Sequence, residues 1–135
     1  MSVLRLDIER FARSGEGIAR VRGVSHLVGL SVPGDLIEAI PTGEDRPGRS
    51  GFRRARILRI RRPSPDRVVP ECPRFGECGG CDWLHVDAGA ALRHKVAAVR
   101  ETSALADDAA VEAIAPAPRR WRRVARLAVG RGPAG

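Results

Sequence analysis

The three cysteines of this 135-residue chain constrain its fold more than any other feature, because all of them lie in one short segment. Residues 72–85 read CPRFGECGGCDWLH, with Cys72, Cys78 and Cys81 in the spacing C-x5-C-x2-C. Glycines between the last two cysteines permit positive φ and let backbone N–H groups approach sulfur. The segment therefore predicts a loop in which thiolates gather around an inorganic centre.

Three kinds of site use cysteines in this way, and the spacing favours two of them. A disulfide framework fits poorly, because an odd number of cysteines without a secretory signal leaves one thiol over. Zinc is open, since His85 follows at a spacing that would complete a Cys3His tetrahedron with Cys72, Cys78 and Cys81. An iron–sulfur cluster is also open, although it normally takes four thiolates and this chain has three.

The part of the chain before the cysteines has the pattern of short strands separated by turns. Turn signals lie at 14–17, where two glycines occur, and at 32–35, which reads VPGD. Apolar and β-branched residues alternate with polar ones between them. We therefore expect residues 1–63 to form a mainly-β, small five-stranded antiparallel barrel of the OB or SH3-like kind. The predicted strands are 3–8, 18–22, 24–30, 36–40 and 53–61.

A helix and an incomplete domain are expected after the cysteine-rich loop, which we place at 64–86. Residues 87–105 carry Leu92, Val96 and Val99 at helical spacing, which predicts one helix with this apolar stripe as its packing face. Short strands are predicted near 111–114 and 124–129. Residues 87–135 are therefore read as the beginning of an α+β central domain.

Charge is distributed unevenly along the chain, whose net charge is +8. Two basic regions, residues 1–70 and 119–135, flank an acidic middle, which suggests that a polyanion such as RNA is contacted from both ends. Arginine clusters are also ordinary solvated surfaces, and Trp121 would serve equally well as a core anchor. The candidate RNA-binding residues are Phe52, Arg53, Arg54, Arg56, Arg119, Arg120, Trp121, Arg122 and Arg123.

Four runs of sequence together resemble one known family. They are LDIERFARSGEGIAR, HLVGLSVPGDLIEAI, ARILRIRRPSPDRVVPECP and CPRFGECGGCDWLH. In this order they resemble the TRAM domain and the iron–sulfur segment of bacterial RNA uracil-5-methyltransferases. The resemblance implies that Cys72, Cys78 and Cys81 are three ligands of a [4Fe–4S] cluster, that a fourth cysteine lies outside this chain, and that His85 is structural. Leu84 and Val124 depart from the family pattern.

The resemblance implies an RNA-binding and cluster-binding front end of a methyltransferase, with ribosomal RNA preferred over transfer RNA. The S-adenosylmethionine domain is missing, so we expect no catalytic residue in this chain and no methylation by it alone. The alternative is a stand-alone RNA-binding module with a structural Cys3His zinc site, and an electron-transfer protein ranks third. No apolar run of membrane-spanning length and no secretory signal are found, so a cytoplasmic monomer is expected.

Overall fold

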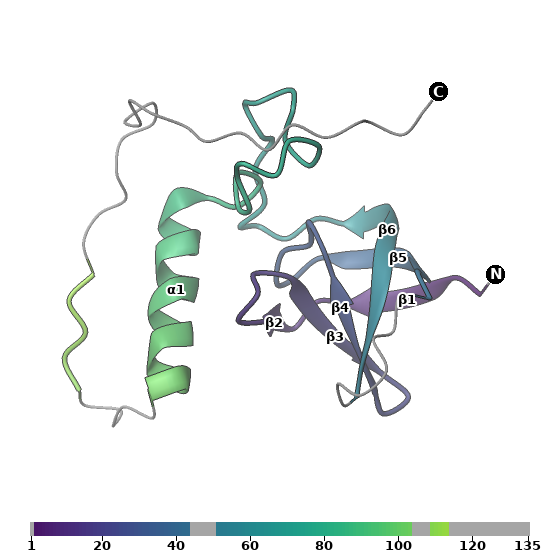
Figure 1. The fold of residues 1–135 in the computed structure, drawn as a ribbon, viewed down its shortest axis with the longest axis horizontal. Coiled ribbons are helices and arrows are strands. Elements are labelled where there is room, and N and C mark those ends of the chain that lie inside the picture. The colour runs from purple at the N-terminus through teal and green to yellow at the C-terminus, as the bar shows by residue number, and fades with distance from the viewer. Residues whose placement is uncertain (1, 44–50, 104–108, 114–135) are drawn as a thin grey trace.

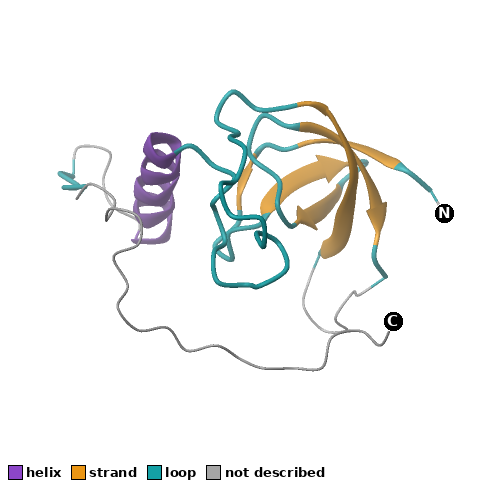
Figure 2. Cartoon of the chain, turned by 90° about the horizontal axis from the view of Figure 1, so that it is seen from above, coloured by secondary structure: helices purple, strands orange, loops and turns teal. Residues whose placement is uncertain are grey.

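One curled sheet and one helix make up the computed structural model, which describes residues 2–43, 51–103 and 109–113. The sheet bends into a half-barrel, the helix stands beside it, and the long loop that follows the last strand lies between them (Figures 1 and 2). The predicted mainly-β fold with a small barrel and one helix is confirmed. The elements are β1 (Leu4–Asp7), β2 (Arg10–Phe11), β3 (Gly17–Val21), β4 (Val24–Val28), β5 (Leu36–Pro41), β6 (Phe52–Arg62) and α1 (Ala88–Ser103).

The sheet differs in two details from the five antiparallel strands expected from the sequence. Its order is β1-β5-β6-β4-β3-β2, and the additional strand β2 has only two residues, too few to show an alternating pattern. The pair β4–β6 is parallel, whereas the other pairs are antiparallel. The chain reverses direction twice between β4 and β6, so these two strands point the same way.

The barrel core is aliphatic and comes from alternate positions of the strands. In β5, for example, Ile37 and Ala39 are fully buried while their neighbours are partly exposed. This is the pattern of a sheet with one face on the core. Burying a side chain such as Leu6 or Ile37 stabilises the fold by about 1.5–3 kcal/mol. The buried cluster consists of Leu6, Ile8, Ala19, Val28, Ile37, Ala39 and Ala55.

The helix α1 starts directly after Asp87, as the sequence predicted to within one residue. The Asp87 side chain accepts a hydrogen bond of 3.0 Å from the Ala90 N–H, which is the usual N-cap arrangement. This bond satisfies one of the donors that a first helical turn leaves without a backbone partner. The helix is followed to Ser103, and residues 104 and 105 of the predicted range lie outside the described residues.

The predicted packing face of α1 is wrong. Ala90 is fully buried and packs with Val32 and Val86, whereas Val99 in the predicted stripe is 48% exposed. Leu92 and Val96 are only partly buried. Small alanine side chains let the helix backbone approach the aromatic rings of the neighbouring segments, so the alanine face and not the bulkier stripe meets the barrel.

The strand predicted near 111–114 is not found where the structure describes that region. Residues 111–113 have no regular structure. A strand needs a neighbour to satisfy its backbone groups, and none of the described strands pairs with this segment. Residue 114 and the predicted strand 124–129 lie outside the described residues. Over the part of the chain that is described, no helix has the length and apolar character needed to cross a membrane.

Candidate functional site

The three cysteine side chains line one small hollow in the loop after the barrel. Cys72, Cys78 and Cys81 are free, exposed thiols, and all three border this hollow. The loop is held by short turns, such as the bond of 3.1 Å from the Cys78 N–H to the Arg74 carbonyl. Gly79 has a φ of 68°, which a residue with a Cβ adopts only with strain. The backbone thus brings all three cysteines to the border of the same hollow.

The described residues do not form an assembled metal site. Among the described residues, no group of three or more His, Cys, Asp or Glu side chains converges as a site for a metal ion. Zinc requires four ligands around one ion at about 2.0–2.3 Å. A cluster distributes its thiolates over several iron atoms, so it needs thiols around a shared hollow. Exposed thiols beside one hollow are donors of the kind that either site uses, and the Gly80 N–H lies 3.4 Å from the Cys78 sulfur as a donor.

His85 does not border the hollow formed by the cysteines. It is 2% exposed, its Nε2 lies 3.4 Å from the Ser31 carbonyl oxygen, and its ring centroid is 5.2 Å from that of Phe75. Burial lowers the pKa of His85, and the nearby Arg67 adds to this effect against the opposing Ser31 carbonyl. The imidazole is therefore neutral at pH 7, and it ties the end of the cysteine segment to the barrel.

An ion pair fixes the start of the cysteine segment to the barrel. The Asp35 carboxylate is fully buried, and Arg67 donates to both of its oxygens at 3.0 and 2.5 Å. The backbone N–H groups of Ser64 and Val32 also donate to it, at 2.8 and 2.7 Å. Burial alone would raise the pKa of Asp35, but these hydrogen bonds and the Arg67 charge bring it below the usual value. Residues 64–67 are thus held against the 32–35 turn.

A tryptophan fixes the other end of the segment, and the sequence reasoning did not single it out. The Trp83 indole N–H donates to the Gly15 carbonyl oxygen at 2.9 Å. Its ring stacks on Phe11 with centroids 4.2 Å apart and an interplanar angle of 27°. A Cβ on Gly15 would lie 3.0 Å from the indole nitrogen, so the glycine makes room for this contact. The position of a tryptophan two residues after the last cysteine was the sequence signal that could have indicated this anchor.

Four of the nine predicted RNA-binding residues lie together at the start of β6. Phe52, Arg53, Arg54 and Arg56 are all exposed, while Ala55 between them is buried. Because side chains alternate along a strand, Phe52, Arg54 and Arg56 project from one face. Arg54 forms an ion pair of 2.6 Å with Glu16, which neutralises part of this face. The other predicted residues, Arg119, Arg120, Trp121, Arg122 and Arg123, lie outside the described residues.

Known proteins resemble this chain over most of its length. No protein-family model matches it. The 23S rRNA (uracil(1939)-C(5))-methyltransferase RlmD of Pectobacterium carotovorum is 38% identical over 120 residues, which are 85% of this chain and 25% of that protein. The RlmD protein of Salmonella typhimurium is 37% identical over 91% of this chain and 26% of its own length. The RlmD protein of Shewanella sp. W3-18-1 is 32% identical over 93% of this chain and 28% of its own length.

The chain spans about a quarter of the length of the curated relatives it matches, and the match falls in their N-terminal part. The resemblance expected from the sequence is confirmed. This chain therefore belongs to the bacterial RNA uracil-5-methyltransferase family, to whose N-terminal part it corresponds.

Proposed function

We propose that this chain is the RNA-binding and cluster-binding front end of a ribosomal RNA uracil-5-methyltransferase. The observation that carries the proposal is the match to proteins named as 23S rRNA uracil-C5-methyltransferases over about nine-tenths of the chain. The small barrel and the exposed arginines of β6 support it physically, because such barrels commonly bind RNA through a basic groove and stacking side chains.

The outer face of β6 is the first proposed RNA contact. Phe52 is 47% exposed and offers a ring on which a base stacks. Arg54 and Arg56 of this face, together with their exposed neighbour Arg53, neutralise phosphates, and RNA competes with Glu16 for the Arg54 guanidinium. The cluster Arg119, Arg120, Trp121, Arg122 and Arg123 is the second proposed contact, on the basis of its charge and aromatic side chain alone.

The cysteine loop is the proposed cluster site. Cys72, Cys78 and Cys81 supply three thiolates, and a fourth ligand comes from outside this chain. A [4Fe–4S] cluster, when bound, would supply a rigid inorganic cross-link for a loop that has no regular structure of its own. The chain's part is to orient the thiols around the hollow and to direct the Gly80 N–H toward sulfur.

Methyl transfer is proposed for the whole enzyme, of which this chain spans about a quarter. The reaction needs a cysteine nucleophile, a base and a methyl donor. All three cysteines here are assigned to the cluster, so the nucleophile and the S-adenosylmethionine site belong to parts that this chain does not span. We expect this chain to bind RNA without transferring a methyl group. We also propose that it is a monomer and that it acts in the cytoplasm, where ribosomal RNA is modified.

A stand-alone RNA-binding module with a Cys3His zinc site is the second candidate. One observation favours it, because the Nδ1 atom of His85 is buried and has no hydrogen-bond partner among the described residues. A metal ion would satisfy that atom. The position of His85 away from the hollow argues against a zinc site, since one zinc ion would need the His85 ring and all three thiols as ligands at the same time.

The proposed function is tested by binding the full chain to a labelled single-stranded fragment of 23S rRNA at several salt concentrations. Affinity should fall with salt with a log–log slope of about −0.7 for each phosphate neutralised. Replacing Arg56 by alanine should reduce this slope by about one contact, whereas Arg5→Ala on β1 should leave it nearly unchanged. Absence of binding, or binding that does not change with salt, would contradict the proposal.

A further inference from the structure

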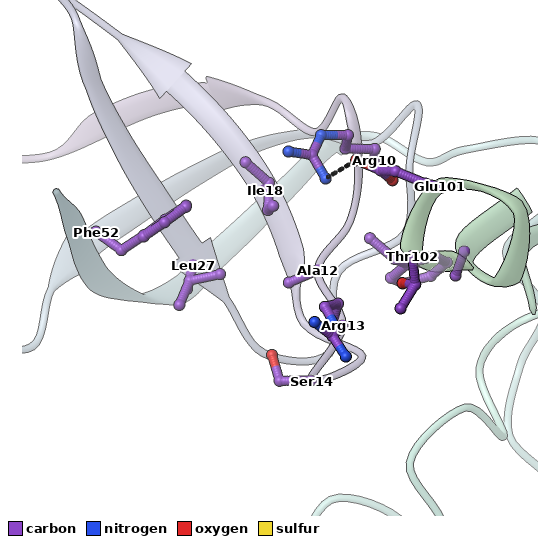
Figure 3. Close-up of a pocket in the computed structure, with 11 residues that line it drawn as sticks. Arg10, Ala12, Arg13, Ser14, Ile18, Leu27, Phe52, Glu101 and Thr102 are labelled. Atoms are coloured by element: carbon purple, nitrogen blue, oxygen red, sulfur yellow. Dashed lines mark ion pairs between the residues drawn. The ribbon is translucent and has the colours of Figure 1, made fainter. Parts of the chain in front are cut away.

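A cleft separates the barrel from α1, and Phe52 is the one proposed contact on β6 that borders it. Its volume is about 580 Å³, and Figure 3 shows side chains from both sides facing it. Phe52 and Leu27 lie at the barrel end, the segment 10–14 forms the floor, and Glu101 and Thr102 of α1 form the opposite wall. The cleft is therefore built from the strand end, the first turn and the last helical turns.

A second hollow shares part of its lining with the cleft. It measures about 520 Å³ and shares Phe11, the segment 12–14 and Ala98 with the first. It ends at Trp83 and Lys95. The two hollows together form an open groove along the join between the barrel and the helix, and its walls come from parts of the chain far apart in sequence.

Aromatic rings lie in both parts of this groove. Phe52 is about half exposed in the first hollow. Phe11 and Trp83 form a stacked pair in the second, and both rings are only partly buried. Each base has a π-face, so rings of this kind bind single-stranded nucleic acid with little sequence preference. The groove offers stacking surfaces at two separate places.

Cations lie between and beside these rings. Arg13 is exposed on the turn that both hollows share, and no ion pair is found for it in the described part of the chain. The Lys95 ammonium lies 5.9 Å from the Trp83 ring centroid. Arg10 is paired at 3.7 Å with Glu101, and Asp82 is the remaining carboxylate of the lining. Arg13 and Lys95, for which no ion pair is found among the described residues, therefore flank the stacking surfaces.

We infer that this groove binds a single-stranded RNA segment of a few nucleotides, with bases on the aromatic rings and phosphates at Arg13 and Lys95. The inference rests on the proposed function and adds a site to it. A covering apolar protein segment fits less well, because it would remove Arg13 and Lys95 from water without a compensating charge. RNA supplies that charge with every phosphate.

A pair of charge-reversed variants tests the site. The full chain is titrated against a fluorescein-labelled oligouridylate of about ten nucleotides, within the site size of such barrels. Arg13→Glu should weaken binding by about tenfold or more, because it replaces a phosphate contact by repulsion. Arg5→Glu changes the net charge equally, but Arg5 is exposed on β1 and outside the groove lining. It should weaken binding much less.

Trp83 provides a second readout that does not depend on a variant of the groove. In a Trp121→Phe chain Trp83 is the only tryptophan, and its emission should be quenched as the oligouridylate binds. The midpoint should equal that of the anisotropy measured on this same chain, because Trp121 is itself a proposed contact. Equal losses in Arg13→Glu and Arg5→Glu, together with unchanged Trp83 emission, would overturn the groove and leave the proposed RNA binding standing. Absence of oligouridylate binding by the unaltered chain would overturn both.

Discussion

The barrel and the cysteine loop differ in what holds each of them in place. The barrel has a six-stranded sheet with continuous ladders and an aliphatic core. The loop carrying Cys72, Cys78 and Cys81 has short turns, and its thiols are exposed. The barrel is therefore held by its own core and strand pairs, whereas the cysteine loop is held to the barrel at its two ends.

The two anchors show how the barrel positions a loop that lacks its own core. Asp35 and Arg67 hold the start of the segment, and Trp83 bonded to Gly15 holds its end. The hydrogen bonds of both anchors attach to turns of the barrel, and Trp83 also stacks on Phe11 of β2. The turns of the barrel thus hold the loop that carries the thiols, in addition to joining the strands.

The largest expected effect comes from breaking the first anchor. Asp35→Asn leaves the mostly buried Arg67 guanidinium without its charge partner, and removing one member of a buried pair costs about 3–5 kcal/mol. The free energy of unfolding should fall by this amount in urea titrations followed by circular dichroism. Glu38→Gln removes the more exposed pair with Arg61 and should cost no more than about 1 kcal/mol. Similar losses in both variants would contradict the anchor.

A smaller effect is expected from overpacking the barrel at Gly17. A Cβ on Gly17 would lie 2.0 Å from the Ser31 hydroxyl and 2.7 Å from an Ile8 methyl. Gly17→Ala should therefore destabilise the fold by about 1–3 kcal/mol, the usual cost of overpacking. Gly29→Ala meets no atom within 4 Å and serves as the control. An equally mild effect of both changes would show that Gly17 is not tightly packed against Ser31 and Ile8.

The smallest effect concerns pH and the buried histidine. The folded-state pKa of His85 lies below the ordinary value of 6.5, so the unfolded chain takes up a proton first as pH falls. Stability should be fully present above pH 6.5 and decline as pH falls from 6.5 toward the folded-state pKa. Asp35, whose pKa is also lowered, adds a second decline only below about 3.8.

Urea midpoints of the metal-free protein measured across this pH range check the prediction. His85→Gln removes the titrating group, so its midpoints should be flatter near pH 6 than those of the unaltered chain. If both proteins lose stability in parallel between pH 7 and 5, the histidine is not the group responsible.

The barrel was predictable because alternation at Ile37 and Ala39 is a local pattern, and the turns at 14–17 and 32–35 have strong sequence signals. The pair Asp35–Arg67 was not, since nothing local shows that residues 32 positions apart will meet. The face of α1 was misjudged because larger apolar residues outweigh alanine in such patterns. The groove between the barrel and α1 could not be predicted either, because its walls also come from residues far apart in sequence.

The most direct test of the cysteine loop as a cluster site is the visible absorbance of anaerobically prepared protein, measured with its iron, sulfide and zinc content. The account predicts brown protein that contains iron and sulfide, and colourless protein when Cys72, Cys78 and Cys81 are replaced by serine with the barrel still folded. Colourless unaltered protein holding one zinc ion per chain would contradict it and place His85 among the ligands.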